Sequence, residues 1–248
     1  ITAAVIGSGS TYCPELVERM EYELDQRIIK AYLAHTDFWW MGNIGRKVNN
    51  WNPWCNSDVI LCFLLMEKDP VRLDRALRQS ARSVDRFLEY VKSDGACEEG
   101  PAYWGHAAGK LYDYLQIMYD ASDGRFDFFD VKQIRDMGEY ISRSYVKNGW
   151  VVNFADASAR LGFSPSVIYN YGKAVGSEFM MTYAALAKEV QDISYKPSED
   201  VFRFFEQLRY DSEFNSYEAE YVAPEYTWYP ETAFHFHKKG DMFFAASA

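Results

Sequence analysis

The sequence predicts an all-α protein, an incomplete α/α toroid of antiparallel helix pairs, with a short β-hairpin at the C-terminus. Apolar residues recur with helical spacing over most of residues 14–210. Long loops join these helical stretches, which is typical of helix pairs stacked around an axis. Residues 232–245 instead alternate apolar and polar side chains next to the turn Lys239–Asp241, which indicates a hairpin.

Three helices are predicted in the N-terminal half. The first spans residues 14–33 and opens with Pro14, in the first helical position that proline favours. The second, residues 57–68, is apolar on most sides and should be buried. The third, residues 71–91, is amphipathic, and we interpret its run of outward arginines as a solvated face paired with nearby aspartates.

The C-terminal half is predicted to contain four more helices, at residues 103–119, 131–146, 180–190 and 199–210. Residues 153–173 are predicted to form a loop near a cleft. We therefore assign residues 1–220 to the toroid domain and residues 221–248 to the start of a further β domain. We expect segments to be missing from both ends of this chain.

Composition limits the possible partners. The net charge of −10 argues against nucleic acid, because phosphate binding needs basic surface. It argues mildly against an acidic polymer too, although a local arginine or lysine patch can outweigh the global sum. No apolar run reaches the ~20 residues of a membrane span. Aromatic residues make up 17% of the chain, and they either fill the core or stack on sugars in an open cleft.

The segment Ala3–Thr11 imitates a dinucleotide-binding fingerprint, with an apolar run followed by Gly7 and Gly9. The third glycine of that fingerprint is absent. No second strand–helix–strand unit follows, because the next hundred or so residues are helical. We therefore reject a nucleotide site here and expect a glycine-containing loop.

Residues 49–56 hold four asparagines and two tryptophans immediately before a predicted buried helix. Helix capping by Asn56 or Ser57 needs only one of these side chains. The surplus indicates a site that offers neutral hydrogen-bond donors beside aromatic faces. The candidate substrate-binding residues in this segment are Trp51, Asn52, Trp54 and Asn56.

Residues 94–106 combine acids, flexible glycines, a tyrosine and a histidine. Tyr103 and His106 are three residues apart and share a face of the predicted helix. Either a functional pair or two core residues with satisfied polar atoms would explain them. Glu99 and Trp104 are further candidate substrate-binding residues.

Together these segments resemble the heparinase II/III-like family of polysaccharide lyases. The resemblance covers the chain from about Pro14 to its end and is carried by the stretches NNWNPWCNS, DGACEEGPAYWGHAAGKLYDYL, NFADAS, YGKAVGSE and WYPETAFHF. The family pairs an α/α toroid with a C-terminal antiparallel β-sandwich, so residues 221–248 would begin that sandwich. The resemblance also implies an exported protein, periplasmic or secreted.

The chemistry that the resemblance implies is β-elimination at a uronic acid of an acidic polysaccharide, with no metal or cofactor. Tyr103 falls on the catalytic tyrosine, which takes a proton and returns one to the leaving oxygen. Asn50, about fifty residues upstream, falls on the asparagine that neutralises the substrate carboxylate. Trp51 stands where some relatives have a histidine, so that role is lost or passes to another residue, for which His106 is the candidate. The family's β-domain histidine lies beyond this chain, which leaves open whether the chain is active alone.

Two other functions fit the same residues. A toroid glycoside hydrolase would use Asp94, Glu98 or Glu99 as acid and base, with carboxyls roughly 6.5–9.5 Å apart in an inverting enzyme. A noncatalytic carbohydrate-binding protein would use the same scaffold without turnover. The combination of tyrosine with asparagine favours the lyase.

Overall fold

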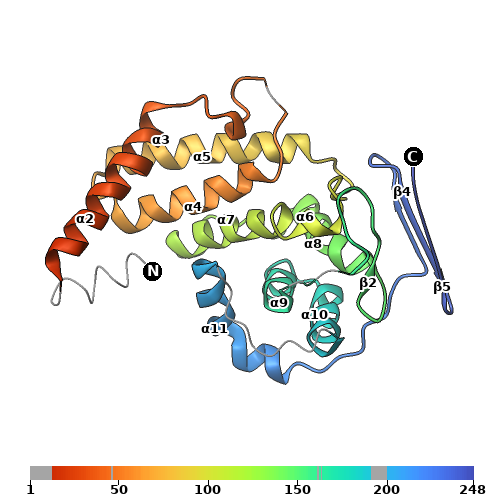
Figure 1. Cartoon of the computed structure of the whole chain (residues 1–248). Coiled ribbons are helices and arrows are strands. Elements are labelled where there is room, and N and C mark those ends of the chain that lie inside the picture. Colours follow the sequence, from red (N-terminus) through yellow and green to blue (C-terminus); the bar gives the residue numbers. More distant parts are fainter. Residues whose placement is uncertain (1–12, 46, 161, 163, 191–199) are drawn as a thin grey trace.

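The computed structural model describes residues 13–45, 47–160, 162, 164–190 and 200–248. It confirms a mostly helical chain with a small C-terminal antiparallel sheet (Figure 1). None of the helices within these ranges is long and apolar enough to cross a lipid bilayer. The glycine-containing segment Ala3–Thr11 lies outside the described residues.

In chain order, the helices and helical turns are α2 (Pro14–Leu24), a π-helical turn (Asp25–Ile29), α3 (Lys30–Ala34), a 3₁₀ turn (Trp39–Met41), α4 (Trp51–Met66), α5 (Pro70–Tyr90), α6 (Pro101–Trp104), α7 (Ala108–Ala121), α8 (Lys132–Arg143), α9 (Pro165–Ala174), α10 (Glu178–Val190) and α11 (Val201–Ser216). The strands are β1 (Tyr145–Lys147), β2 (Trp150–Val151), β3 (Tyr226–Tyr229), β4 (Phe234–Lys239) and β5 (Met242–Ser247). Helix α4 packs on both α5 and α7, and α9 packs on α10 and α11.

Helix α4 begins at Trp51, earlier than the predicted start at residue 57. The predicted capping by Asn56 or Ser57 is therefore wrong, because Asn50 occupies the capping position. Two buried amides hold this first turn against α5. Asn52 Nδ2 donates to Trp40 O at 2.8 Å and to Ser83 O at 2.9 Å, and Asn56 Nδ2 donates to Ser83 Oγ at 2.9 Å.

The helix predicted at residues 103–119 is divided into α6 and α7 by a break at residues 105–107. Gly105 has low helix propensity. Its carbonyl also accepts a hydrogen bond from Arg203 Nη2 of α11 at 2.6 Å. That contact comes from a segment almost a hundred residues away, so local periodicity could not indicate the break.

Helix α9 replaces part of the loop predicted at residues 153–173. Residues 165–172 are all buried, so the helix lacks the polar face that gives an amphipathic pattern. Tyr171 donates its hydroxyl proton to Ile134 O at 2.7 Å. Gly172 lets α10 approach closely, since a Cβ at this position would lie 2.7 Å from Met180 Cβ.

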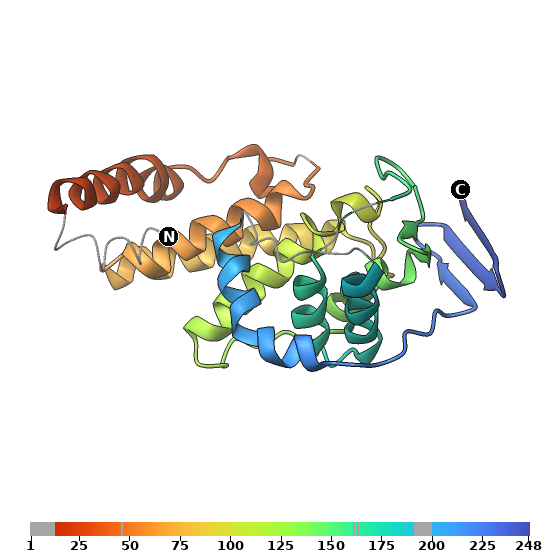
Figure 2. The ribbon, with the colours of Figure 1, turned by 60° about the horizontal axis from the view of Figure 1, so that its bottom comes forward.

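The predicted C-terminal hairpin is present as β4 and β5, and β3 adds a third antiparallel strand in the order β3-β4-β5. In both ribbon views this sheet lies at the end of the molecule far from α2 (Figures 1 and 2). Its inner face packs on the helical part. Phe154 contacts Phe234 and Phe236, with ring centroids 4.9 and 5.9 Å apart, and Tyr140 contacts Tyr229.

Asp94 joins the sheet to the helices. Its carboxylate accepts hydrogen bonds from the backbone N–H groups of Glu231 at 2.9 Å and Thr232 at 2.8 Å. It also accepts from the Thr232 hydroxyl at 2.9 Å and from the Ala96 N–H at 3.2 Å. These bonds engage both carboxylate oxygens, so Asp94 has a structural role at the junction of the sheet and the helices.

Asp94→Ala is expected to lower the free energy of unfolding by about 2–3 kcal/mol, because several hydrogen bonds to a charged acceptor are lost together. Chemical denaturation measures this. Glu98→Ala in the same loop is the control, and it should change the stability by about 1 kcal/mol at most because Glu98 makes exposed ion pairs. Equal effects of the two substitutions would contradict the assignment.

Candidate functional site

A row of aromatic rings lies along the N-terminal ends of α4 and α6. We call Trp39, Trp51, Trp54, His106 and Tyr103 the aromatic row. Trp51 and Trp54 stack at 5.4 Å between centroids with planes 13° apart, and Trp54 and His106 stack at 4.6 Å and 4°. Trp39 meets Trp51 edge to face at 6.2 Å, and Tyr103 meets His106 in the same way at 6.2 Å. Trp39 and Trp51 are 44% and 45% exposed, so flat apolar faces are available at the surface.

Local helix geometry produces this row. Trp51 and Trp54 are three residues apart on the first turn of α4 and therefore share a face. Tyr103 lies on the short α6, and His106 lies in the break before α7. The prediction that Tyr103 and His106 lie together is confirmed, although the helix does not continue through both residues.

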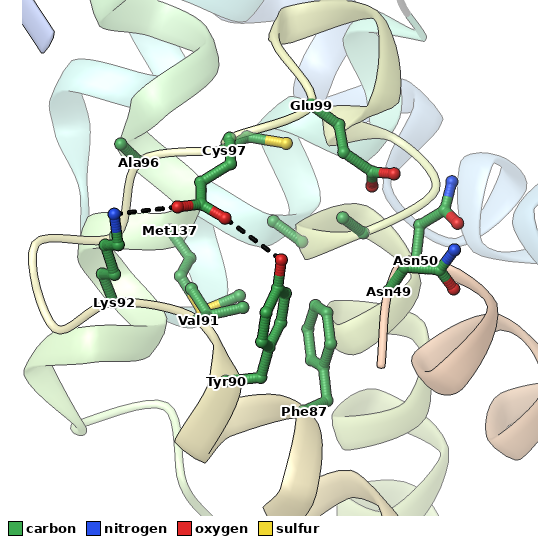
Figure 3. Close-up of a pocket in the computed structure, with 14 residues that line it drawn as sticks. Asn49, Asn50, Phe87, Tyr90, Val91, Lys92, Ala96, Cys97, Glu99 and Met137 are labelled. Atoms are coloured by element: carbon green, nitrogen blue, oxygen red, sulfur yellow. Dashed lines mark hydrogen bonds and ion pairs between the residues drawn. The ribbon is translucent and has the colours of Figure 1, made fainter. Parts of the chain in front are cut away.

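A pocket lies next to this row along the chain, and Figure 3 shows the side chains that line it. Asn50 and Glu99 line it, together with Asn49, and their side chains lie at the same end of the pocket. Burial and the nearby Asp156 carboxylate raise the pKa of Glu99, and the Asn50 backbone and Lys47 act in the opposite direction only in part.

Glu98 differs from its neighbour Glu99. Lys92 pairs with its carboxylate at 2.8 Å, and the Tyr90 hydroxyl donates to it at 3.1 Å (Figure 3). The hydrogen bond from Lys92 holds the pKa of Glu98 below its ordinary value against the effect of burial. Glu98 is therefore an ion-paired carboxylate. Of these two glutamates, Glu99 takes up a proton at the higher pH.

A buried cluster of charges underlies the row, and the sequence did not predict it. The Lys110 side chain is 2% exposed, and its Nζ lies 3.4 Å from both Asp58 and Asp113 and also bonds Asp200. Arg203 Nε donates to Asp113 at 2.7 Å. Burial acts to lower the pKa of Lys110, but Asp113 and Asp58 outweigh it and the pKa is raised. The only sequence signal was the helical spacing of Lys110 and Asp113.

This charge cluster affects His106. Burial lowers the pKa of His106, and the positive charges of Arg203 and Lys110 lower it further. His106 is therefore a neutral imidazole at neutral pH, able to accept a proton. The Lys110 ammonium also lies 5.8 Å from the centroid of Trp54, the ring on which His106 stacks.

Three predicted substrate-binding residues are buried and have structural roles instead. Asn52 and Asn56 are 0% exposed, and their amides bond α5 and the preceding loop. Trp104 is 2% exposed and donates its indole N–H to Met137 O at 2.9 Å. The prediction that these three contact substrate is wrong, because their polar atoms are satisfied below the surface.

The remaining predicted residues form two adjacent groups. Trp51, Trp54, Tyr103 and His106 belong to the aromatic row, whereas Asn50 and Glu99 belong to the pocket. The groups are joined because Asn50 directly precedes Trp51, and Ala107, which follows His106, lines the pocket. No hydrogen bond connects Asn50 to Tyr103. Among the residues that the structure describes, no three His, Cys, Asp or Glu side chains are placed to hold a metal ion.

Comparison with known proteins adds no assignment. No protein-family model matches this chain, and no curated protein matches it. The site therefore has to be interpreted from its own geometry.

Glu99→Gln should stabilise the protein increasingly as the pH rises. The folded state holds the Glu99 proton to higher pH than the unfolded chain does, so its ionisation destabilises the fold as the pH rises through the raised pKa. We expect the stability of the variant relative to the wild type to increase between about pH 4 and pH 7, as measured by urea denaturation.

Glu98→Gln is the matched control of opposite sign. The pKa of Glu98 is lowered, so its ionised form stabilises the fold above the unfolded pKa, and this stabilisation is lost as the pH falls. The control should therefore be less stable than the wild type at neutral pH, with the difference closing in acid. Parallel pH profiles for the two variants would refute the assignment.

Proposed function

We propose that this chain is the helical part, an incomplete α/α toroid, of an exported polysaccharide lyase that cleaves uronic acid-containing glycans by β-elimination. The observation that carries the proposal is the aromatic row, which ends at Tyr103 and His106 and is joined along the chain, at Asn50–Trp51 and at His106–Ala107, to the pocket of Asn50 and Glu99. The Trp39 and Trp51 rings, which are 44% and 45% exposed, offer apolar surface that suits the C–H faces of sugars. In this proposal the Asn50 and Glu99 side chains of the pocket would bind the sugar carboxylate.

Tyr103 is the proposed acid and base. Its phenolate oxygen would take the proton on the carbon next to the uronate carboxyl, and the glycosidic bond one carbon further would then break. The same hydroxyl would return a proton to the leaving oxygen, so that a double bond forms in one sugar and a free hydroxyl in the other. The position of Tyr103 at the end of the aromatic row supports this role.

Removal of that proton places extra negative charge on the uronate carboxyl group, and donors must stabilise it. The Asn50 amide can donate without carrying a base of its own. The raised pKa of Glu99 favours its protonated form, which could donate a second hydrogen bond. Neutral His106 is the second group able to accept a proton, and its contact with Tyr103 makes it the partner that would ionise the phenol.

Tyr103→Phe in the full-length protein is expected to lower the cleavage rate by about 10²–10⁴, the usual contribution of a general acid–base group. The measurement is ultraviolet absorbance of the unsaturated product on a panel of uronic acid polymers. Tyr22→Phe, on an exposed side chain of α2, is the control and should retain full activity. Equal activity of both variants would refute the role of Tyr103.

Trp51→Ala should weaken substrate binding and leave the chemical step intact. Loss of one stacking face costs about 0.5–1.5 kcal/mol, which corresponds to a rise in KM of about 2- to 12-fold with little change in kcat. Trp150→Ala removes a tryptophan that is 47% exposed on β2, outside the row, and serves as the control. A KM that responds equally to the two substitutions would contradict glycan stacking on the row.

A glycoside hydrolase is the second candidate, because Glu99 lines the pocket and the negative charge of Asp156 acts, after burial, to raise the pKa of Glu99. In that case Glu99→Gln would abolish cleavage, and the products would carry no new double bond. Glycan binding without turnover would instead indicate a noncatalytic binding protein. Product absorbance identifies a lyase, and release of new reducing ends without absorbance separates a hydrolase from a noncatalytic binding protein.

A further inference from the structure

A second polar hollow lies on the exposed side of α5, away from the pocket that holds Glu99. It has a volume of about 480 Å³ and is lined by three arginines and three uncharged polar residues, namely Arg75, Arg78, Arg82, Thr36, Asn43 and Gln79. Asp74 is the only acidic residue in this lining. Three positive charges against one negative charge give the hollow an excess of two positive charges, in a protein whose net charge is −10.

The three arginines retain hydrogen-bonding capacity. Arg75 uses Nη2 to donate to Leu33 O at 2.8 Å, which anchors the side chain without neutralising it. Arg78 donates through Nε to Asp74 at 2.9 and 3.0 Å, so its Nη groups are not used in that pair. No carboxylate of the described chain lies within ion-pair distance of Arg82.

Two other arginines of α5, both outside the hollow, are each paired with a carboxylate. Arg72 pairs with Glu67 at 3.2 Å and with Asp25 at 3.6 Å. Arg86 pairs with Glu89 at 2.7 Å. The arginine run was predicted to be a solvated face neutralised by aspartates, and this holds for Arg78 but not for Arg82. Positive charge is therefore concentrated in the middle of α5, where the surface is hollowed.

The loop over α5 carries residues of both this hollow and the aromatic row. Thr36 and Asn43 line the hollow, and Asn43 Nδ2 donates to Thr36 O at 2.9 Å, which closes the loop on itself. Between them, Trp39 meets Trp51 of the row. Trp39 of the aromatic row therefore belongs to the same loop as two residues of the arginine hollow.

We propose that this arginine hollow binds the anionic groups, sulfate or carboxylate, of an acidic glycan whose neighbouring sugars lie on the aromatic row. Guanidinium groups form paired, charge-assisted hydrogen bonds with such oxyanions. Local positive charge outweighs the acidic balance of the whole chain at this point. The assignment of the ligand to a glycan rests on the proposed function, whereas the anion site itself does not.

The test is binding of the full-length protein to dextran sulfate, which carries sulfates but no uronate, and to alginate, which carries carboxylates but no sulfate. Neutral dextran is the blank. The double variant Arg78→Ala/Arg82→Ala should bind at least one of the two polymers about tenfold or more weakly than the wild type. The polymer affected identifies the anionic group. Arg86→Ala, on the same helix but outside the hollow, should change the affinity less than about twofold.

Equal losses in Arg86→Ala and in a single Arg82→Ala variant would overturn the proposal, because the binding would then follow net charge alone. If the protein binds duplex DNA with the same affinity as the glycans, the assignment of the ligand to a glycan is overturned. Dextran sulfate cannot undergo elimination, so Tyr103→Phe should bind it normally. If the full-length protein cleaves none of the uronic acid polymers, but the arginine double variant still binds an anionic polymer more weakly, the proposed function is refuted. The anion site is then still supported.

Discussion

The buried ammonium of Lys110 is the constraint on which the helical part of this protein depends. A charged group that is 2% exposed is tolerable only with partners, and Lys110 has three carboxylates, on α4, on α7 and at the start of α11. Because Arg203 also pairs with Asp113, the cluster has two cations and three acids. These ion pairs join α4, α7 and α11, so the cluster fixes how the three helices pack together.

The same cluster shapes the proposed site. Arg203 reaches past Asp113 to the carbonyl of Gly105, at the point where α6 ends and the chain turns before α7. This turn carries His106, which stacks on Trp54 with the two ring planes almost parallel. Burial lowers the pKa of this imidazole, and the positive charges that hold the helices together lower it further. Packing and acid–base properties therefore have a common origin, and α11 acts on the site without contributing a surface residue to the row.

The asparagine-rich segment shows how hydrogen-bond satisfaction divides neighbouring residues into structural and functional groups. On the first turns of α4, Asn52 and Asn56 point towards α5. Their amide groups donate hydrogen bonds to Ser83 and to backbone carbonyls. Trp51 and Trp54 point the other way and stay accessible or half-buried. A buried amide without a hydrogen-bond partner would lower the stability of the fold. The bonds of Asn52 and Asn56 to α5 therefore fix the first turns of α4, and with them the positions of Trp51 and Trp54.

The sequence by itself determined the helical class, the C-terminal hairpin and the nearness of Tyr103 to His106, because each depends on periodicity or on spacing of a few residues. It also indicated that residues 49–56 hold more polar and aromatic groups than capping needs, but it could not tell which of them face inward. Tertiary structure alone decided that Asn52, Asn56 and Trp104 are buried, that Asp94 holds the sheet, and that α9 is a helix. It also decided that Lys110 and Arg203 meet beneath the aromatic row. These features depend on contacts between residues up to 138 positions apart, and local pattern carries no information about such contacts.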